Sequence, residues 1–203
     1  MLVSTNQGNI YKINSAGTPS LIASVGEDTE GMDIASTAYG KYAGQLLVSS
    51  EGSGRIRAIK ADGTVSVLQA ARGGDVHIAS AETVSVVPLN LGASGNPLEG
   101  FYVANYAVDI QFAPASQFTG LNGNAIVTSE FGSNSTVWLL SYNGDGLDTF
   151  DVTAIGALPN QSEDGIFVTA ERIIDVTTPE PTSVALLGIG LAGVALTRRR
   201  KVA

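Results

Sequence analysis

Short apolar runs separated by small polar turns dominate the first 176 residues of the chain. Three stretches share an apolar pair, hydroxyl residues, a glycine-bearing loop, a second strand-like run and a polar turn. They begin at Leu2, Leu47 and Ile126. This pattern is typical of β-hairpins. Asp62-Gly63 predicts the clearest turn, of type I′, because both residue types tolerate positive φ. Further strands are predicted in "DVHIA" and "ETVSVVPLN", residues 75–79 and 82–90.

A second marker recurs along the chain at a long spacing. The runs "EGMDIA", "EGFYVA" and "EDGIFV" begin at Glu30, Glu99 and Glu163, so the marker returns after 69 and then 64 residues. Self-similarity at a fixed period is typical of repeat folds, in which each unit buries one face against the next. We therefore expect residues 1–176 to form an all-β body, a propeller-like repeat of antiparallel β-sheets. A β-sandwich is the alternative.

The body pattern resembles the six-bladed propellers that include NHL-repeat and gluconolactonase-like proteins, in which an apolar strand precedes a glycine-bearing hairpin. Two to three units are too few to close a ring, so the resemblance implies that further blades precede Met1. No secretory leader follows Met1, and export would require one. We therefore expect an N-terminally truncated sequence.

Charge and composition narrow the possible partners. The 203 residues carry 11 basic and 19 acidic groups, for a net charge of −8. Four of the basic residues stand together at 198–201, which leaves seven against the 19 acidic ones elsewhere. Such a body repels phosphates, so nucleic acids are not expected as partners. The absence of cysteine excludes disulfides and thiolate chemistry.

The final 27 residues, 177–203, differ from the body in composition: a proline-containing segment, an apolar run and a basic cluster follow one another. Pro179-Glu180-Pro181 cannot lie inside a helix or a central strand, so the segment should form an extended hinge. An apolar run follows and predicts a short transmembrane helix over residues 182–197. Arg198, Arg199 and Arg200 should hold the C-terminus in the cytoplasm, with the body on the periplasmic side of the inner membrane.

The order of Pro-Glu-Pro, apolar run and arginine cluster at the chain end resembles the PEP-CTERM sorting signal of Gram-negative bacteria. This resemblance implies recognition by a membrane-embedded exosortase, cleavage near Pro179–Pro181, and transfer of the body to the cell surface or an exopolysaccharide matrix. An ordinary bitopic protein that keeps its membrane anchor is the alternative interpretation of the same residues.

No catalytic residue is assigned in the body. His77 is the only histidine and lies in a predicted strand without a nucleophile motif nearby, so we expect it to be structural. The leading hypothesis is a non-enzymatic binding or structural role. The alternative is a calcium-dependent lactonase-like hydrolase. Glu30 in "EGMD" resembles the metal-binding glutamate near the start of a gluconolactonase-like blade, and Asp33 and Glu99 could share a central axis with it, so the resemblance implies these three residues as candidate Ca²⁺ ligands.

Overall fold

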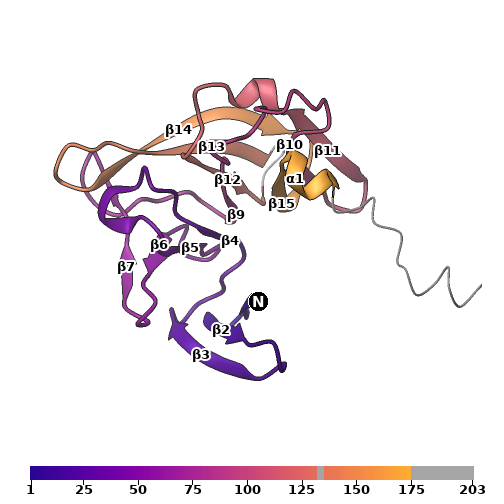
Figure 1. The fold of residues 1–203 in the computed structure, drawn as a ribbon. Helices are drawn as coiled ribbons and strands as arrows, with labels where there is room; N and C mark the ends of the chain where they lie inside the picture. Colours follow the sequence, from indigo (N-terminus) through magenta and orange to yellow (C-terminus); the bar gives the residue numbers. More distant parts are fainter. Residues whose placement is uncertain (132–134, 175–203) are drawn as a thin grey trace, which may run out of the picture. The chain divides into compact units, whose positions relative to one another are not determined.

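The computed structural model describes residues 1–131 and 135–174, and Figure 1 traces the chain from its N-terminus to α1. The chain divides into two compact units, Met1–Thr169 and Ala170–Ala203. In the second unit the described residues form the short helix α1, Ala170–Ile174. The helix predicted over 182–197 and the sorting tail lie outside the described residues. Within the described residues, no helix combines the length and the apolar character needed to cross a membrane.

The first unit consists of four β-sheets. Their strand orders are β1-β2-β3, β4-β5-β6-β7, β8-β14-β13-β12-β9 and β11-β10-β15. All neighbours are antiparallel except β8 and β14. None of the four sheets closes on itself. The prediction of an all-β body of antiparallel sheets is therefore confirmed, whereas the propeller ring stays a prediction.

Most strands are short, and two 3₁₀ turns interrupt them. The strands are β1 Leu2–Ser4, β2 Asn9–Ile13, β3 Pro19–Ser24, β4 Met32–Ile34, β5 Leu46–Ser49, β6 Ile56–Ile59, β7 Val65–Val67, β8 Gln69–Ala70, β9 Ala81–Val86, β10 Gly100–Asn105, β11 Asp109–Pro114, β12 Ala125–Ser129, β13 Ser135–Tyr142, β14 Thr149–Leu158 and β15 Ser162–Val168. The 3₁₀ turns are η1 Gly40–Tyr42 and η2 Ala115–Phe118.

The three predicted hairpins all form. They are the antiparallel pairs β1 with β2, β5 with β6, and β12 with β13. The type I′ turn predicted at Asp62-Gly63 is wrong, because only Gly63 has positive φ (87°). The Gly63 amide donates to the carbonyl of Lys60 (2.9 Å), and the Lys60 amide donates to Thr64 (2.9 Å). The turn is therefore a longer loop with a single left-handed glycine.

Residues 75–79, predicted as a strand, form none. Two isolated bridges hold this segment to neighbouring residues instead. Val76 and Ile78 are buried in the core while His77 is exposed. The apolar alternation therefore reflects a loop that inserts every second side chain into the core. The other predicted strand, in 82–90, is confirmed as β9.

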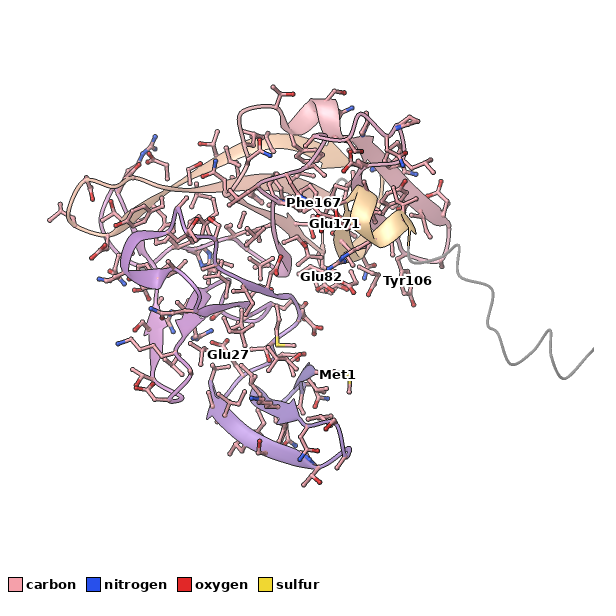
Figure 2. The ribbon with its side chains drawn as sticks, viewed as in Figure 1. Met1, Glu27, Glu82, Tyr106, Phe167 and Glu171 are labelled. Atoms are coloured by element: carbon pink, nitrogen blue, oxygen red, sulfur yellow. The ribbon has the colours of Figure 1, made fainter. Side chains whose placement is uncertain are left out.

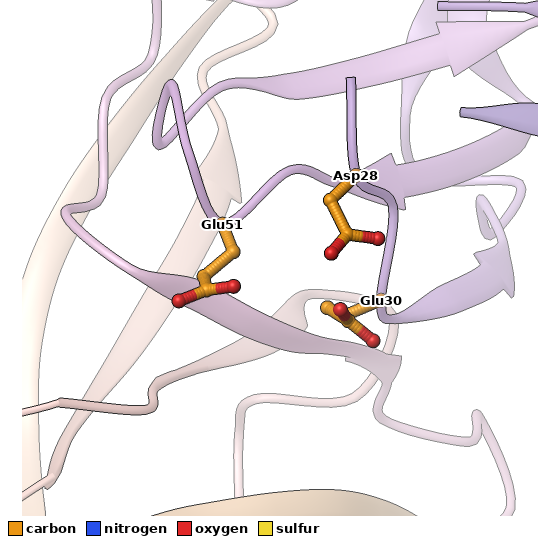
Figure 3. Close-up of side chains that lie close together, drawn as sticks. All are labelled: Asp28, Glu30 and Glu51. Atoms are coloured by element: carbon orange, nitrogen blue, oxygen red, sulfur yellow. The ribbon is translucent and has the colours of Figure 1, made fainter. Parts of the chain in front are cut away.

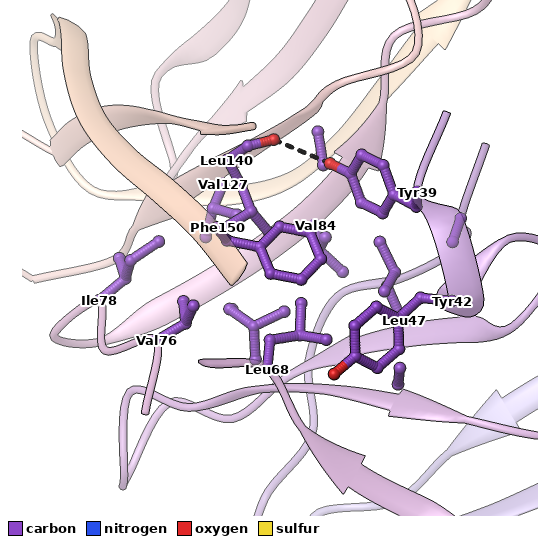
Figure 4. Packing of buried hydrophobic residues seen from close by; sticks show 14 of the residues in the cluster. Tyr39, Tyr42, Leu47, Leu68, Val76, Ile78, Val84, Val127, Leu140 and Phe150 are labelled. Carbon is purple, nitrogen blue, oxygen red and sulfur yellow. Dashed lines mark hydrogen bonds between the residues drawn. The ribbon is translucent and has the colours of Figure 1, made fainter. Parts of the chain in front are cut away.

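The largest core cluster joins the sheet β4-β5-β6-β7 to the sheet β8-β14-β13-β12-β9. Leu47 and Ile56 from the first sheet share the cluster with Val127 and Leu140 from the second, and all four are fully buried. Burial of each such side chain stabilises the fold by about 1.5–3 kcal/mol. The buried Tyr39 donates its hydroxyl proton to the Leu140 carbonyl at 2.8 Å, as Figure 4 shows.

Three of the sheets meet along their edge strands. β9 is the last strand of its sheet, and β4 and β15 are the edges of theirs. The Gly31 amide, directly before β4, donates to the Glu82 carbonyl of β9 at 2.7 Å. The Ser85 hydroxyl of β9 donates to the Gly165 carbonyl of β15 at 2.9 Å. The edge strand β9 therefore lies between β4 and β15.

Candidate functional site

Six carboxylates gather where these three edge strands begin, and we call this set the acidic end. They come from the loop before β4, the second residue after β5, strand β9, the residue after β12, and strand β15. Its members are Asp28, Glu30, Glu51, Glu82, Glu130 and Glu163. Because neighbouring strands are antiparallel, the start of one strand lies beside the end of the next. The strand order within each sheet, together with the hydrogen bonds between the three sheets, therefore brings residues far apart in sequence to one place.

Backbone hydrogen bonds fix the acidic end. The Glu30 amide donates to the Ser49 carbonyl at 3.2 Å, which places Glu30 beside the end of β5. The Ser49 hydroxyl donates to the Glu82 carbonyl at 2.7 Å, which ties β5 to β9. The Glu130 amide donates to the Ser80 carbonyl at 2.8 Å, directly before β9. These carboxylates therefore project from a hydrogen-bonded framework.

Three members lie especially close together, and we call them the carboxylate triad: Asp28, Glu30 and Glu51. One carboxylate oxygen from each lies within 4.8 Å of the others, and Figure 3 shows the three side chains. Burial, followed by the charge and hydrogen bond of Asp28, raises the pKa of Glu30. Oxygen ligands at this spacing suit a hard divalent cation, which needs further oxygens to complete its shell.

Glu82, labelled in Figure 2, is the most buried carboxylate of the acidic end. Only 8% of the residue is exposed. Within residues 1–131 and 135–174, no donor hydrogen-bonds to its carboxylate and no cation pairs with it. Burial, and then the charges of Glu30 and Glu130, raise the pKa of Glu82 to about 8. A charged carboxylate without a partner is costly in such a place.

Glu130 shares this environment. Burial and a hydrogen bond with Glu51 raise its pKa to about 7, although the side-chain amide of Gln161 acts in the opposite direction. The same Gln161 amide contacts Glu130 and also donates to Glu163 at 3.2 Å. Gln161 therefore links the carboxylate that follows β12 to the carboxylate on β15.

The buried arginine of the first unit does not neutralise the acidic end. Arg57 is 6% exposed and pairs with Glu27, and it also donates to the Ser50 hydroxyl at 2.6 Å. Burial works to raise the pKa of Glu27, but the hydrogen bonds from Ser53 and Arg57 outweigh it and lower that pKa. Glu27 therefore keeps an ordinary charged partner, in contrast to Glu82.

Asn105 is a buried polar residue of the β11-β10-β15 sheet. It ends β10 and lies opposite Ser162 at the start of β15. The residue is 4% exposed, and its side-chain Oδ1 has no hydrogen-bond partner among the described residues. Its amide nitrogen donates to Asp109 at 2.7 Å. A buried carbonyl oxygen with a free acceptor therefore stands at the same end of the sheets.

The structure separates the three predicted Ca²⁺ candidates. Glu30 belongs to the carboxylate triad. Asp33 instead accepts hydrogen bonds from the backbone amides of Ile34 and Val86, both at 2.7 Å. Glu99 precedes β10, at the opposite end of that strand from Asn105, and accepts the Ser94 hydroxyl at 2.7 Å. The shared axis predicted for the three residues is therefore not what the fold produces.

Sequence reasoning missed five members of the acidic end, although two of them had a detectable pattern. Glu51 in "LVSSEG" and Glu130 in "IVTSEF" occupy the same position in two of the three similar stretches. The third stretch has Asn6 there. His77, predicted to be structural, has its Nδ1 3.0 Å from the Ser53 carbonyl oxygen.

Comparison with known proteins identifies the tail. Residues 177–201 match the PEP-CTERM protein-sorting motif, and this range includes the Pro-Glu-Pro element and the three arginines. PEP-CTERM motifs are recognised by exosortase, which supports that enzyme as a partner and export toward the cell envelope or surface. No curated protein matches the chain significantly. The body's resemblance to NHL and gluconolactonase-like propellers is therefore not supported by a relative.

Proposed function

We propose that this protein is exported, sorted by exosortase through its C-terminal tail, and serves a non-enzymatic binding or structural role at the cell surface or in the extracellular matrix. The observation that carries the proposal is the sorting-motif match over residues 177–201. The motif stands at the end of an acidic, cysteine-free, β-rich chain. Exopolysaccharide is the matrix ligand we propose for the body.

In this proposal the tail acts in three parts. Residues 182–197 enter the inner membrane as a short helix, and the arginines that follow keep the end of the chain in the cytoplasm. The body then lies on the periplasmic side. Pro179 and Pro181 keep the segment before the helix extended, because proline lacks an amide donor and fixes φ. An extended segment at the membrane surface is open to cleavage.

We further propose that the body is a propeller-like array. In a propeller the innermost strand of each blade lies beside the innermost strand of the next. The edge strand β9 lies between β4 and β15 in the same manner, and the order β4-β5-β6-β7 is that of a four-stranded antiparallel blade. This arrangement would display loops at the strand ends to a polymeric ligand.

The sorting proposal is tested by the mass of the mature protein. The chain, fused to a functional secretory leader, is expressed in a host with exosortase and in the matching strain without it. We expect loss of the C-terminal segment near Pro179–Pro181 only where the enzyme is present. Changing both prolines to alanine should cause full-length precursor to accumulate in the membrane, whereas the control Pro97→Ala in an exposed loop should be processed normally.

A surface-localised protein that still ends at Ala203 in the exosortase-positive strain would contradict sorting and favour a permanent bitopic anchor. A second candidate function is a calcium-dependent lactonase-like hydrolase, which the acidic end favours because it offers hard oxygen ligands at converging strand ends. Calcium-stimulated hydrolysis of simple lactones by the purified chain, lost in Glu30→Gln, would select this candidate over the binding role.

A further inference from the structure

An aliphatic groove with a volume of about 230 Å³ lies between the sheets β1-β2-β3 and β4-β5-β6-β7. We call it the lysine groove. Its main lining residues are four aliphatic ones and two lysines: Leu2, Ile34, Leu46, Ile59, Lys12 and Lys60. The other residues that line it are also aliphatic or small. None of them belongs to the acidic end, so the lysine groove is a separate feature of the body.

One wall of the lysine groove is a row of aliphatic side chains across three strands. Ile34 of β4 lies opposite Leu46 of β5, and Leu46 lies opposite Ile59 of β6. Residues that face each other on antiparallel strands point to the same side of the sheet. Exposure rises along the row, from 2% at Ile59 and 7% at Leu46 to 48% at Ile34. The row therefore runs from the core to the surface.

The core holds both walls in place. Leu46 and Ile59 belong to a buried cluster that also contains Ile10 of β2, and Leu2 packs against the same cluster. The two sheets therefore share one hydrophobic core beneath the groove. A ligand would meet walls that are already formed, as is usual for small-molecule sites.

The two lysines bring positive charge to these walls. Lys12 of β2 lies opposite Leu2 of β1, so both side chains point to one face of their sheet. Lys60 follows Ile59 directly, and both lysines are exposed. A lysine lays its apolar stem along such a surface and keeps its ammonium group in water. The groove therefore offers ammonium groups at the edge of an aliphatic wall.

Neither lysine belongs to an ion pair within residues 1–131 and 135–174. The pairs found there are Lys41–Asp148, Arg55–Asp75 and Arg57–Glu27. The backbone amide of Thr64 is the main cause that lowers the pKa of Asp62, and the charge of Lys60 is a minor one. In a chain with 11 basic and 19 acidic groups, two cations without an ion-pair partner line one apolar groove. Their charge is complementary to an anionic ligand.

We propose that the lysine groove binds an aliphatic monocarboxylate, such as a medium-chain fatty acid. The carboxylate lies at the lysines, and the acyl chain lies along the row from Ile59 to Ile34. Among the described residues that line the groove, none has a hydroxyl, amide or aromatic side chain. Such a lining suits an acyl chain and lacks the polar groups that orient a sugar.

Size and charge favour a small monoanion over larger anionic ligands. Sites for drug-sized ligands measure about 300–1,000 Å³, so the lysine groove has room for one short acyl chain. A polyanion would be repelled by the many acidic groups of the chain. A single carboxylate avoids most of this repulsion, because exposed charges more than about 8 Å apart are largely screened at physiological salt. The proposal goes beyond the sorting role and the polysaccharide ligand and depends on neither.

The test uses the full 203-residue chain in phosphatidylcholine nanodiscs, titrated with sodium octanoate by isothermal calorimetry. Empty nanodiscs are the blank for partition into lipid. We expect saturable binding at one site per chain. Butanoate should bind at least about tenfold more weakly, because it buries four methylene groups fewer. Octylammonium, with the same chain length and the opposite charge, should not displace octanoate.

Variants of exposed residues distinguish the groove from the rest of the surface. Lys12→Gln and Lys60→Gln should each weaken octanoate binding about two- to fivefold, as expected for exposed ion pairs. Arg72→Gln is the matched control, because Arg72 is exposed and lies outside the groove. It should bind octanoate like the parent chain.

A second pair of variants tests the aliphatic wall. Ile34→Ser removes the exposed end of the row and should weaken octanoate binding about threefold or more. Leu21→Ser is its control, because Leu21 is 58% exposed and does not line the groove. Both side chains are exposed, so both variants should fold, which equal melting temperatures would verify.

Three outcomes would overturn the proposal. The first is the absence of saturable octanoate binding below its micelle-forming concentration. The second is displacement of octanoate by octylammonium. The third is parent affinity in a chain that carries Lys12→Gln, Lys60→Gln and Ile34→Ser together. None of these results depends on whether exosortase cleaves the tail, so failure here is distinct from failure of the sorting proposal.

Discussion

The Ser49 hydroxyl donates a 2.7 Å hydrogen bond to the main-chain carbonyl of Glu82 and joins two sheets that share no ladder hydrogen bonds. The same hydroxyl accepts the Gly31 amide at 2.9 Å. Ser49 is fully buried, so water cannot replace it. Together with the backbone bond from the Gly31 amide to the Glu82 carbonyl, this side chain therefore links the loop before β4, the end of β5 and strand β9, from which the acidic end projects.

We predict that Ser49→Ala lowers the free energy of unfolding by about 0.5–1.5 kcal/mol, because two buried hydrogen bonds of the hydroxyl are lost while the Gly31 amide and the Glu82 carbonyl keep their direct bond to each other. Chemical denaturation of the full chain measures the change. Ser15→Ala, at an exposed turn, is the matched control and should leave stability unchanged. Equal stability of the two variants would contradict the structural role of Ser49.

Alanine variants of Gly63 and Gly17 form a matched pair that tests how closely the loop between β6 and β7 approaches β3. Both have positive φ, 87° and 79°, so alanine is strained at either position by about 1 kcal/mol. A Cβ on Gly63 would lie 2.3 Å from the Ile22 carbonyl oxygen, whereas a Cβ on Gly17 meets nothing within 4 Å. We expect Gly63→Ala to lower the melting temperature clearly more than Gly17→Ala. Similar melting temperatures would show that the approach to Ile22 is not maintained.

Stability without metal should fall as pH rises. The pKa of Glu82 is about 8 in the folded chain and that of Glu130 is about 7, against an ordinary glutamate value of 4.5. The folded state therefore binds more protons than the unfolded state between about pH 4.5 and 8, so the free energy of unfolding decreases across this window. Thermal unfolding with a chelator at pH 5 to 9 measures the slope.

Glu82→Gln should flatten this profile and stabilise the chain at pH 8 relative to the parent, because a neutral amide replaces a carboxyl that must ionise there. Asp151→Asn, outside the acidic end, should leave the profile unchanged. A parent profile that rises from pH 5 to 8 would refute the assignment of raised pKa values to the acidic end.

The arginine cluster predicts the orientation of the tail. With a secretory leader, the body should be digested by protease added outside the inner membrane, while a tag placed after Ala203 stays protected. Changing Arg198, Arg199 and Arg200 to glutamine should yield a mixture of orientations and reduce retention before cleavage. Protection of the body together with digestion of the tag would reverse the proposed topology.

Local sequence pattern predicted the hairpins well but could not assign sheet partners. The pairs β5–β6 and β12–β13 follow from apolar runs and glycine-bearing loops. Strands β10 and β11 lie between β9 and β12 in sequence, yet β10 pairs with the much later β15. Such a pairing depends on side-chain packing between distant segments, which no window of neighbouring residues contains.

The candidate site was predictable only in part for a similar reason. Glu30 was a candidate because "EGMD" resembles the metal-binding segment of a gluconolactonase-like blade, and Glu51 and Glu130 share a position in two similar stretches. Glu82 lies in the ordinary strand run "AETVSV", where a polar residue in alternation usually faces solvent. Its burial results from contacts with the loop before β4 and the end of β5, and no feature of its own segment indicates this.

Asp33, expected to bind metal, has another effect through its hydrogen bond to the Val86 amide. Val86 lies on β9, an edge strand whose free amides and carbonyls could recruit a strand from another molecule. The Asp33 carboxylate accepts the hydrogen bond of that amide. On the same strand, the Gly31 amide and the Ser49 hydroxyl donate to the Glu82 carbonyl. An inward-turned charge thus blocks strand addition along β9. The same contacts therefore protect this edge against cross-β aggregation between copies of the chain.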